Sequence, residues 1–452
     1  MSSTSRRAPL ASPTAQARVD RASSADRAFL AMDRGLVPQQ FGVVLGLEGH
    51  LDLSAVTELV AERVRAVPRL RQRLVRVPFG LGGPLWLDDA GFDVRRHVRE
   101  VSCPPPGDEP ALMDVALSAV TTRLPPDAPL WSIVLVGDVA GGRSALVVVL
   151  HHVLADGIGG LGVLAALVDP GRESFPAEFP RPRPTVTTLL EDSVATKLQA
   201  LVGLPASWRL LRSSMTAGGG LRPPPAAACS LVQRIGPRRQ VLVVRWDVDS
   251  LRAAAHAHSA TVNDALLVAV AGALEQVLRH RGEHADRLSI AVPVSGRPAD
   301  ADRSVGNLVS PLLVAVPTTG PQRRRLAEVA AAVKALKPLA LAPAPIAVLG
   351  WLFRPLAALG GYAWYLNHQR RFHTLVSHVR GPAAPLSFGG SRIDSAVPLG
   401  VADGGNTTVY VDALSYDGTL TLAAVVDPDH FPDADVLTRA LEDELRAVCS
   451  PS

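Results

Sequence analysis

The sequence predicts a two-lobed α/β protein in which each lobe combines a mixed sheet with helices. The chain has 452 residues, enough for two or three domains at about 150 residues each. Strand-like and helix-like segments alternate in both halves, and a stretch rich in Pro and Gly over residues 170–240 separates them. Because sites often form between two lobes, we expect a cleft at their interface.

Composition excludes several classes of protein. The hydrophobic fraction is 47% and the formal net charge only +4, so there is ample material for large cores and no concentrated basic stripe for nucleic acid. Arg323–Arg325 is too short a run to form one. The cysteines, Cys103, Cys229 and Cys449, are three and far apart. They predict neither a disulfide framework nor a metal site, and a reducing cytoplasm is the simplest location.

The first half is expected to hold a tail and one lobe. Residues 1–22 are Arg- and Ser-rich without the apolar core of a signal peptide and are predicted to be a disordered tail. Residues 23–185 are predicted to form the N-terminal lobe. Its expected helices are 26–35, 52–75, 108–124 and 159–168, and its expected strands are 40–49 and the strand–turn–strand segment 129–157.

The second half is expected to repeat this mixture after a crossover. Residues 186–239 are predicted to be a linker that contains one helix, and residues 240–452 the C-terminal lobe. Its expected elements are the strands 240–250, 288–298, 312–318, 374–382 and 408–429, and the helices 250–282, 323–336 and 433–448.

One apolar stretch, residues 339–366, raises the question of membrane contact. Prolines 343, 345 and 355 and Arg354 interrupt it, so it lacks the roughly 18 clean apolar residues of a span. We consider three roles for it: a hydrophobic entrance for acyl chains, a segment that rests on a membrane or lipid droplet, or an ordinary helical hairpin of the second lobe.

The most informative segment is "LVVVLHHVLADGIGG", residues 146–160. Its apolar run lacks alternation, which predicts a strand buried on both faces. The run ends in His151 and His152, where a strand meets a cleft, and neutral imidazole is the usual general base near neutral pH. Asp156 cannot face His152 along a straight strand. The glycines that follow give the freedom to turn. The alternative is a structural histidine pair followed by a helix N-cap aspartate.

This segment resembles the His-His-x-x-x-Asp-Gly motif of the chloramphenicol acetyltransferase-like superfamily. Other segments resemble motifs of the bacterial wax ester synthase/acyl-CoA:diacylglycerol acyltransferase family within it. They follow the family's order from about residue 23 to 448: "SSADRAFL" (23–30), "PLW" (129–131), "TVNDALLVAVAGAL" (261–274), "VPVSGRP" (292–298), "VGNLVSPLLVAVPT" (305–318) and "SHVRGP" (377–382).

The resemblance implies a fold and a reaction. The fold would be a pseudo-dimer of two chloramphenicol acetyltransferase-like lobes, with the active-site tunnel at their interface. The reaction would move an acyl group from acyl-CoA, or from an acyl carrier protein, to a fatty alcohol or diacylglycerol, giving wax ester or triacylglycerol. It implies no acyl-enzyme, and no cofactor or metal besides acyl-CoA as substrate. The expected location is cytoplasmic, with possible peripheral contact with a membrane or lipid droplet.

The resemblance also implies roles for individual residues. His152 would take the acceptor's proton, and Gly157 would let the backbone approach the reacting carbonyl. Asp156 would brace the two lobes by pairing with Arg297. For His151, a structural hydrogen bond is weighed against a catalytic part. Residues expected to contact substrate are Trp131, Asn263, Asp264, Asn307, Ser377 and His378, and for Asn263 and Asp264 capping of the long helix is an equal alternative.

Two positions depart from the family pattern and keep other functions open. His378 stands where the family usually has Asn, and Arg380 where it usually has Pro. The chain is therefore also consistent with a specialised-metabolite ester or amide synthase that uses small acyl groups. A degenerate, non-enzymatic scaffold is a third alternative, against which the intact motif and Arg297 argue.

Overall fold

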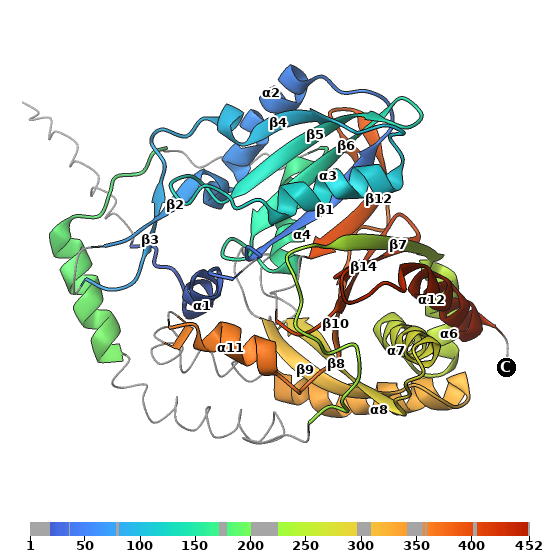
Figure 1. Ribbon diagram of the computed structural model, residues 1–452. Helices are drawn as coiled ribbons and strands as arrows, with labels where there is room; N and C mark the ends of the chain where they lie inside the picture. The colour runs from blue at the N-terminus through green and yellow to red at the C-terminus, as the bar shows by residue number, and fades with distance from the viewer. Residues whose placement is uncertain are drawn as a thin grey trace, which may run out of the picture.

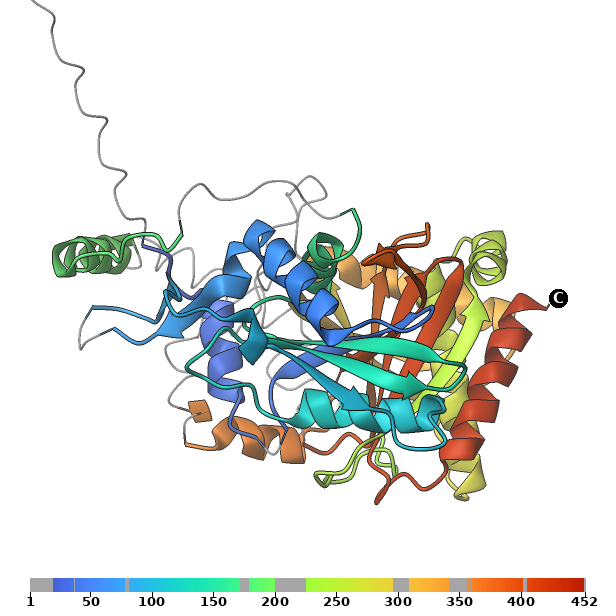
Figure 2. The ribbon, with the colours of Figure 1, turned by 90° about the horizontal axis from the view of Figure 1, so that it is seen from above.

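The computed structural model contains two six-stranded sheets with helices packed on and between them (Figures 1 and 2). A separate two-stranded ribbon pairs β2 (Gln72–Val75) with β3 (Leu85–Asp88). The structure describes residues 19–35, 37–77, 81–170, 179–199, 225–295, 309–340, 356–357, 359–400 and 405–450.

The first sheet has the strand order β11-β12-β1-β6-β5-β4. β6 lies between β1 and β5, and every residue of it except Arg143 is buried, which confirms the prediction that both of its faces are covered. The strands are β11 (Ser387–Phe388), β12 (Ser391–Gly400), β1 (Gln40–Leu47), β6 (Arg143–His151), β5 (Trp131–Val139) and β4 (Val98–Ser102).

Helices cover both faces of this sheet. On one face α3 packs over valines of β5 and β6. The other face carries a second core that includes residues of α2 and α4 and also Leu414 and Tyr416 from the second sheet. The bounds are α1 (Ser24–Met32), α2 (Leu53–Arg63), α3 (Glu109–Thr121) and α4 (Gly157–Leu167).

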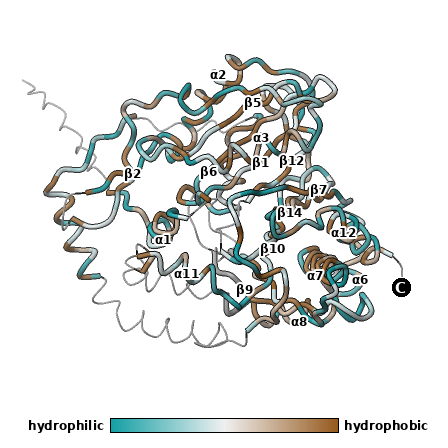
Figure 3. Tube along the Cα trace, viewed as in Figure 1, coloured by the Kyte–Doolittle hydropathy of each residue, from teal (hydrophilic) through white to brown (hydrophobic). Residues whose placement is uncertain are grey.

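The second sheet has the order β7-β14-β13-β10-β8-β9 and packs its helices on one side. Among them α7 is buried along nearly its whole length and is coloured brown in Figure 3. The elements are β7 (Gln240–Asp247), α6 (Val248–Ala257), α7 (Val262–His280), β8 (Arg287–Ser295), β9 (Val309–Pro317), α8 (Gln322–Ala340), α11 (Gly361–His368), β10 (Thr374–Arg380), β13 (Val409–Tyr416), β14 (Thr419–Val426) and α12 (Ala434–Cys449).

The position of β12 in the first sheet was not expected from the sequence. β11 and β12 belong to the second half of the chain, yet β12 pairs antiparallel with β1 in the first sheet, with Phe41 opposite Gly400. In Figure 1 the orange β12 lies beside the blue β1. The first lobe is therefore completed by residues that lie beyond 240, and the two lobes share backbone hydrogen bonds.

Two other expectations are corrected. The helix expected over 52–75 ends at Arg63, because Pro68 breaks the helical pattern, and the chain continues as 3₁₀ turns and β2. The tail expected to reach residue 22 is ordered at its end, because Asp20 and Ala22 hydrogen-bond to the backbone around β3. Residues 1–18 lie outside the described residues.

No single described helix is long and apolar enough to cross a bilayer. α6 and α7 meet that criterion only as a pair bent by 97°, and α7 is the core helix of the second lobe. Of the apolar stretch 339–366, residues 341–355 and 358 lie outside the described residues, and the described part includes the first turns of α11.

Candidate active site

His152 lies directly after the last residue of β6, where the first sheet ends. Its backbone N–H donates to the carbonyl of Gln39 at 2.9 Å, and the N–H of His151 donates to the carbonyl of Leu130 at 3.1 Å. The two histidines are thus fixed between the strands on either side of β6. The imidazole of His152 therefore lies at the end of β6, as the apolar run followed by His-His predicted.

Two phenylalanine rings hold the imidazole of His152. Phe29 of α1 stacks on it with a centroid distance of 5.1 Å and an interplanar angle of 15°, and Phe41 of β1 lies 4.7 Å away at 37°. Gly160 makes room for this arrangement, because a Cβ there would lie 2.9 Å from Cε2 of Phe41. The orientation of His152 is therefore set by packing from three elements.

The surroundings keep His152 neutral. Burial lowers its pKa to about 4, and the neighbouring His151 adds to this, while a hydrogen bond with the Ala155 backbone opposes it. At neutral pH the imidazole is therefore unprotonated, as a general base requires.

His151 is held by hydrogen bonds of its own. Its Nδ1 accepts from the backbone N–H of Val153 at 3.0 Å, so the ring proton belongs on Nε2, which lies 3.3 Å from the Asp33 carboxylate. Although burial acts to raise the pKa of Asp33, the bonds from His151 and the Gln39 amide outweigh it, and the pKa falls below its usual value. This geometry fits a structural role for His151.

Asp156 and Gly157 begin α4. Asp156 is the N-cap, and its Oδ1 accepts the N–H of Gly159 at 2.8 Å, so the chain turns before this side chain and separates it from His152. Gly157 faces the second lobe, where a Cβ would lie 3.1 Å from Cγ2 of Val379 in β10. Arg297, which the resemblance predicts as the partner of Asp156, lies outside the described residues.

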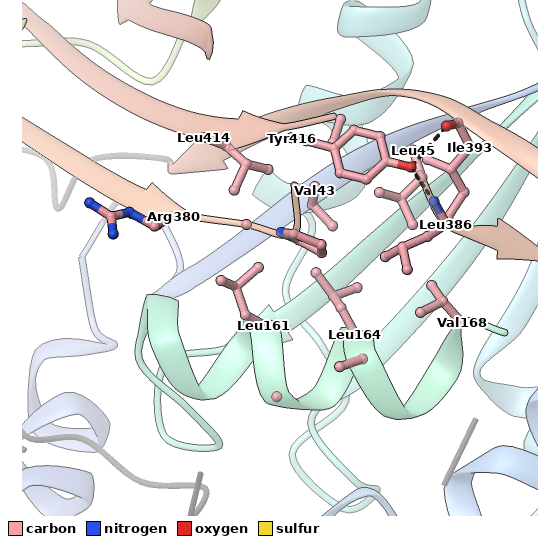
Figure 4. Close-up of a pocket in the computed structure, with 15 residues that line it drawn as sticks. Val43, Leu45, Leu161, Leu164, Val168, Arg380, Leu386, Ile393, Leu414 and Tyr416 are labelled. Atoms are coloured by element: carbon pink, nitrogen blue, oxygen red, sulfur yellow. Dashed lines mark hydrogen bonds between the residues drawn. The ribbon is translucent and has the colours of Figure 1, made fainter. Parts of the chain in front are cut away.

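An apolar cavity of about 350 Å³ runs along α4 between the two lobes (Figure 4). A narrower cavity shares Val43, Leu161, Leu164 and Leu414 with it and extends to Gly157 and Phe41. The combined space, the acyl cavity, therefore begins beside the Phe41 ring that packs on His152. It widens toward Tyr416, whose hydroxyl donates to the carbonyl of Ile393 and accepts from the N–H of Leu386.

Trp131 corrects one substrate-contact prediction. Its indole is 1% exposed, donates to the carbonyl of Leu70 at 2.7 Å and stacks on His97 at 4.4 Å. A buried indole with a satisfied N–H belongs to the core, so the structure assigns Trp131 to packing beneath the first sheet.

The remaining predicted contacts lie in the second lobe. Asp264 completes a capping box with Thr261 at the start of α7, next to Asn263. Ser377 and His378 lie in β10. The Nε2 atom of His378 is buried and has no hydrogen-bond partner among the described residues. Burial, together with the charge of Arg380, lowers the pKa of His378 to about 4. The substrate contacts of these residues stay predictions, and Asn307 lies outside the described residues.

Sequence reasoning missed four residues that shape the site, namely Phe29, Phe41, Gly160 and Asp33. Aromatic residues are only 4% of the chain, and Phe29 and Phe41 both lie in segments close to the start of the first lobe. The scarcity of aromatic residues is only a weak indication that Phe29 and Phe41 belong to the site. No local pattern links either ring to a histidine more than a hundred positions away.

The first six-stranded sheet is completed by β12 from the second half of the chain. This arrangement, with a neutral histidine at the end of β6 and an apolar cavity between the lobes, defines an acyltransferase fold of two lobes. The wax ester synthase/diacylglycerol acyltransferase catalytic domain matches residues 23–266, and the C-terminal domain of the same family matches residues 305–448. The chain therefore belongs to the wax ester synthase/diacylglycerol acyltransferase family and is an O-acyltransferase.

Relatives agree with this assignment, and a solved structure shares the fold. The chain is 30% identical over 424 residues to proteins of Mycobacterium bovis and Mycobacterium tuberculosis that are named as diacylglycerol O-acyltransferases, with 89% of each chain covered. The wax ester synthase/diacylglycerol acyltransferase from Marinobacter aquaeolei VT8 superposes with a TM-score of 0.65 at 20% identity, covering 95% of this chain and 98% of that one.

A condensation domain shares the same fold. The starter condensation domain of rhizomide synthetase, solved as a mutant in complex with C8-CoA, superposes with a TM-score of 0.62 at 14% identity, covering 96% of this chain and 95% of that one. Together these structures confirm the predicted α/β fold with two chloramphenicol acetyltransferase-like lobes.

Proposed function

We propose that the protein transfers an acyl group from acyl-CoA to the hydroxyl of a fatty alcohol or diacylglycerol, with His152 as general base. The observation that carries the proposal is the neutral imidazole of His152, fixed between Phe29 and Phe41 where the acyl cavity begins. The named activity of the mycobacterial relatives supports the same substrates.

The reaction needs a base, an oriented thioester and a dry site. His152 accepts the hydroxyl proton while the oxygen attacks the thioester carbonyl, and the resulting imidazolium returns that proton to the departing thiolate. The O–C bond forms and the C–S bond breaks without an acyl-enzyme. The backbone at the N-terminus of α4, beginning at Gly157, presents N–H groups near the site that can stabilise the oxyanion.

The acyl chain of the donor occupies the acyl cavity in this proposal. Its lining is mostly aliphatic, with Arg380 and Tyr416 as the polar side chains. Apolar area removed from water contributes about 25 cal/mol per Å². The narrower part of the cavity reaches Phe41, whose ring packs on His152, so in this proposal a chain bound there leaves its thioester carbonyl near the histidine.

The test is transfer by the purified protein. Long-chain acyl-CoA is supplied with diacylglycerol or a fatty alcohol, and free CoA and lipid ester are both measured. The proposal expects CoA release that depends on the acceptor and yields one ester per CoA. CoA release without ester, or transfer only to small hydroxy or amino metabolites, would refute the assignment of acceptor.

We also propose that one side of the protein touches a lipid surface. The described helical residues 186–199 stand apart from both sheets (Figures 1 and 2). Large apolar side chains are exposed here and around α11: Val186, Leu190, Val194, Leu198, Leu356, Leu359, Trp364 and Tyr365. The four on the first helix recur every fourth residue and so share a face, which is the pattern of an interfacial helix.

Cosedimentation with vesicles tests this contact. The wild-type protein is expected to bind phosphatidylcholine vesicles that contain diacylglycerol, whereas a Leu190→Ser, Val194→Ser variant binds less. A matched Glu191→Ser, Asp192→Ser variant changes the polar face of the same helix. Equal binding of all three proteins, or no binding by any, would refute a lipid contact at this helix.

A further inference from the structure

A carboxyl group that the proposed reaction does not use lies where the two lobes meet. Asp412 belongs to β13, and because alternate residues of a strand share one face, it points to the same side as Leu414 and Tyr416. Both of those side chains line the acyl cavity and belong to the core of the first lobe (Figure 4). Asp412 therefore faces the first lobe, where its Oδ2 accepts the N–H of Gly400 in β12 at 2.9 Å.

Asp412 lies beyond the narrow end of the acyl cavity. Val379 of β10 is paired in register with Leu414, and both line the narrower part of that cavity. Two residues back along the same strands, and on the same face, Ser377 is paired with Asp412. The cavity widens in the opposite direction, toward Tyr416. Ser377 and Asp412 are therefore the polar side chains at its reaction end.

A chain of contacts links Asp412 to His152. Gly400, whose N–H binds the Asp412 carboxyl group, lies opposite Phe41 in the pairing of β12 with β1. The ring of Phe41 packs on the imidazole of His152, with 4.7 Å between the ring centroids. A Cβ at position 400 would collide with Oδ2 of Asp412, so glycine allows the carboxyl group to lie against the backbone of β12. The carboxyl group is thus fixed beside the strand pair that orients the base.

The carboxyl group of Asp412 keeps unused capacity to accept hydrogen bonds. In the described part of the chain, the N–H of Gly400 is its one hydrogen-bond donor, and no cation forms an ion pair with it. Burial raises the pKa of Asp412 to about 6, although the bond from Gly400 acts to lower it. The side chain nevertheless keeps some accessible surface, as His152 does. This combination is that of a carboxylate that borders an enclosed space.

We propose that Asp412 binds a hydroxyl group of a substrate, a few bonds away from the reacting carbon. A hydroxyl group donates one hydrogen bond and, unlike an ammonium group, loses little solvation beside an apolar cavity. A site with a buried acceptor discriminates against an analogue that lacks the hydroxyl, because the acceptor then loses its hydrogen bond. This inference rests on the proposed acyl transfer and names a substrate class for it: long-chain molecules hydroxylated next to the reacting group.

Either the acyl donor or the acceptor alcohol supplies this hydroxyl group, and two pairs of substrates distinguish the sources. Hexadecanoyl-CoA is compared with 3-hydroxyhexadecanoyl-CoA, each with hexadecanol as acceptor. Hexadecanol is compared with hexadecane-1,2-diol, each with hexadecanoyl-CoA as donor. The value of kcat/KM is measured for wild type, Asp412→Asn and the matched control Asp394→Asn. Asp394 also lies beside Gly400's strand partners on β12, but it pairs with Arg143 at 3.1 Å and lines neither part of the acyl cavity.

The proposal expects wild type and Asp394→Asn to use the hydroxylated member of one pair about tenfold to a hundredfold better than its partner. Asp412→Asn is expected to lose most of this preference, through a lower kcat/KM for the hydroxylated substrate alone. Asparagine keeps an oxygen that accepts the N–H of Gly400 but carries no charge. A preference for 3-hydroxyhexadecanoyl-CoA identifies the donor as the source of the hydroxyl, and a preference for the diol identifies the acceptor.

Three results would overturn the proposal: no preference of wild type for the hydroxylated member of either pair, an undiminished preference in Asp412→Asn, or an equal loss in that variant with all four substrates. The first readout needs no variant and so does not depend on the folding of Asp412→Asn. Transfer from hexadecanoyl-CoA to hexadecanol tests the proposed function separately, because neither molecule carries the additional hydroxyl group.

Discussion

Replacing Gly160 by alanine tests whether packing holds His152 in place. The added Cβ would lie 2.9 Å from Cε2 and 3.1 Å from Cζ of Phe41, whereas carbon atoms pack at about 3.5–4.0 Å. The Phe41 ring must therefore move by about half an ångström or more, and it is the ring that lies 4.7 Å from His152. The structure thus predicts an effect on both stability and rate.

Two opposing energies set the size of the stability change. Alanine in place of a helical glycine gains about 1 kcal/mol from helix propensity. Overpacking of a filled core costs about 1–3 kcal/mol. Since the overpacking cost is the larger, we expect a net loss of up to about 2 kcal/mol. Displacement of the base should lower kcat/KM by about tenfold or more.

The assay combines denaturant unfolding with steady-state kinetics on acyl-CoA, and Phe41→Leu supplies the control. In the double variant the smaller side chain relieves the clash, so the cost of Gly160→Ala should shrink or change sign. A Gly160→Ala protein that is more stable than wild type and has unchanged kcat/KM would refute the reasoning.

Three further predictions concern other parts of the site. Ala396→Phe fills the acyl cavity that Ala396 lines, so the preferred acyl chain should become shorter in a competition assay with mixed acyl-CoAs, and an unchanged profile would place the chain elsewhere. Trp131→Phe removes the hydrogen bond to Leu70 and should cost about 1–2 kcal/mol of stability with KM unchanged, whereas a raised KM would restore a substrate contact. The His378 pKa of about 4 lies below the unfolded value, so the unfolded chain takes up a proton as pH falls below about 6.5 and stability drops. Between about pH 7.5 and pH 5 the free energy of unfolding should therefore fall by up to about 2 kcal/mol less in His378→Asn than in wild type. Parallel curves of this free energy against pH would contradict the prediction.

Local pattern predicted the elements that carry the motif. The unbroken apolar run of β6 indicated burial on both faces, and the structure confirms it, because such a feature depends on residues adjacent in sequence. The expectation that the glycines after Asp156 form the turn is wrong: they begin α4, and the chain turns at residues 152–154, before Asp156. For Asp156 the sequence offered a helix N-cap as the alternative, and the structure places Asp156 at the N-cap of α4.

The pairing of strands far apart in the chain could not be predicted from local sequence patterns. β12 joins β1 across some three hundred and fifty positions, and nothing in its own alternation distinguishes it from a strand of the second sheet. The same holds for the rings around His152. Phe29 and Phe41 contact it only because α1 and β1 are brought to the end of β6.

The turnover of His152→Ala tests the central claim most directly. The account predicts that kcat with long-chain acyl-CoA and a saturating alcohol falls by about 10²–10⁴-fold while the protein stays folded and still binds acyl-CoA. If the folded variant kept more than about a tenth of wild-type turnover, His152 would not be the general base.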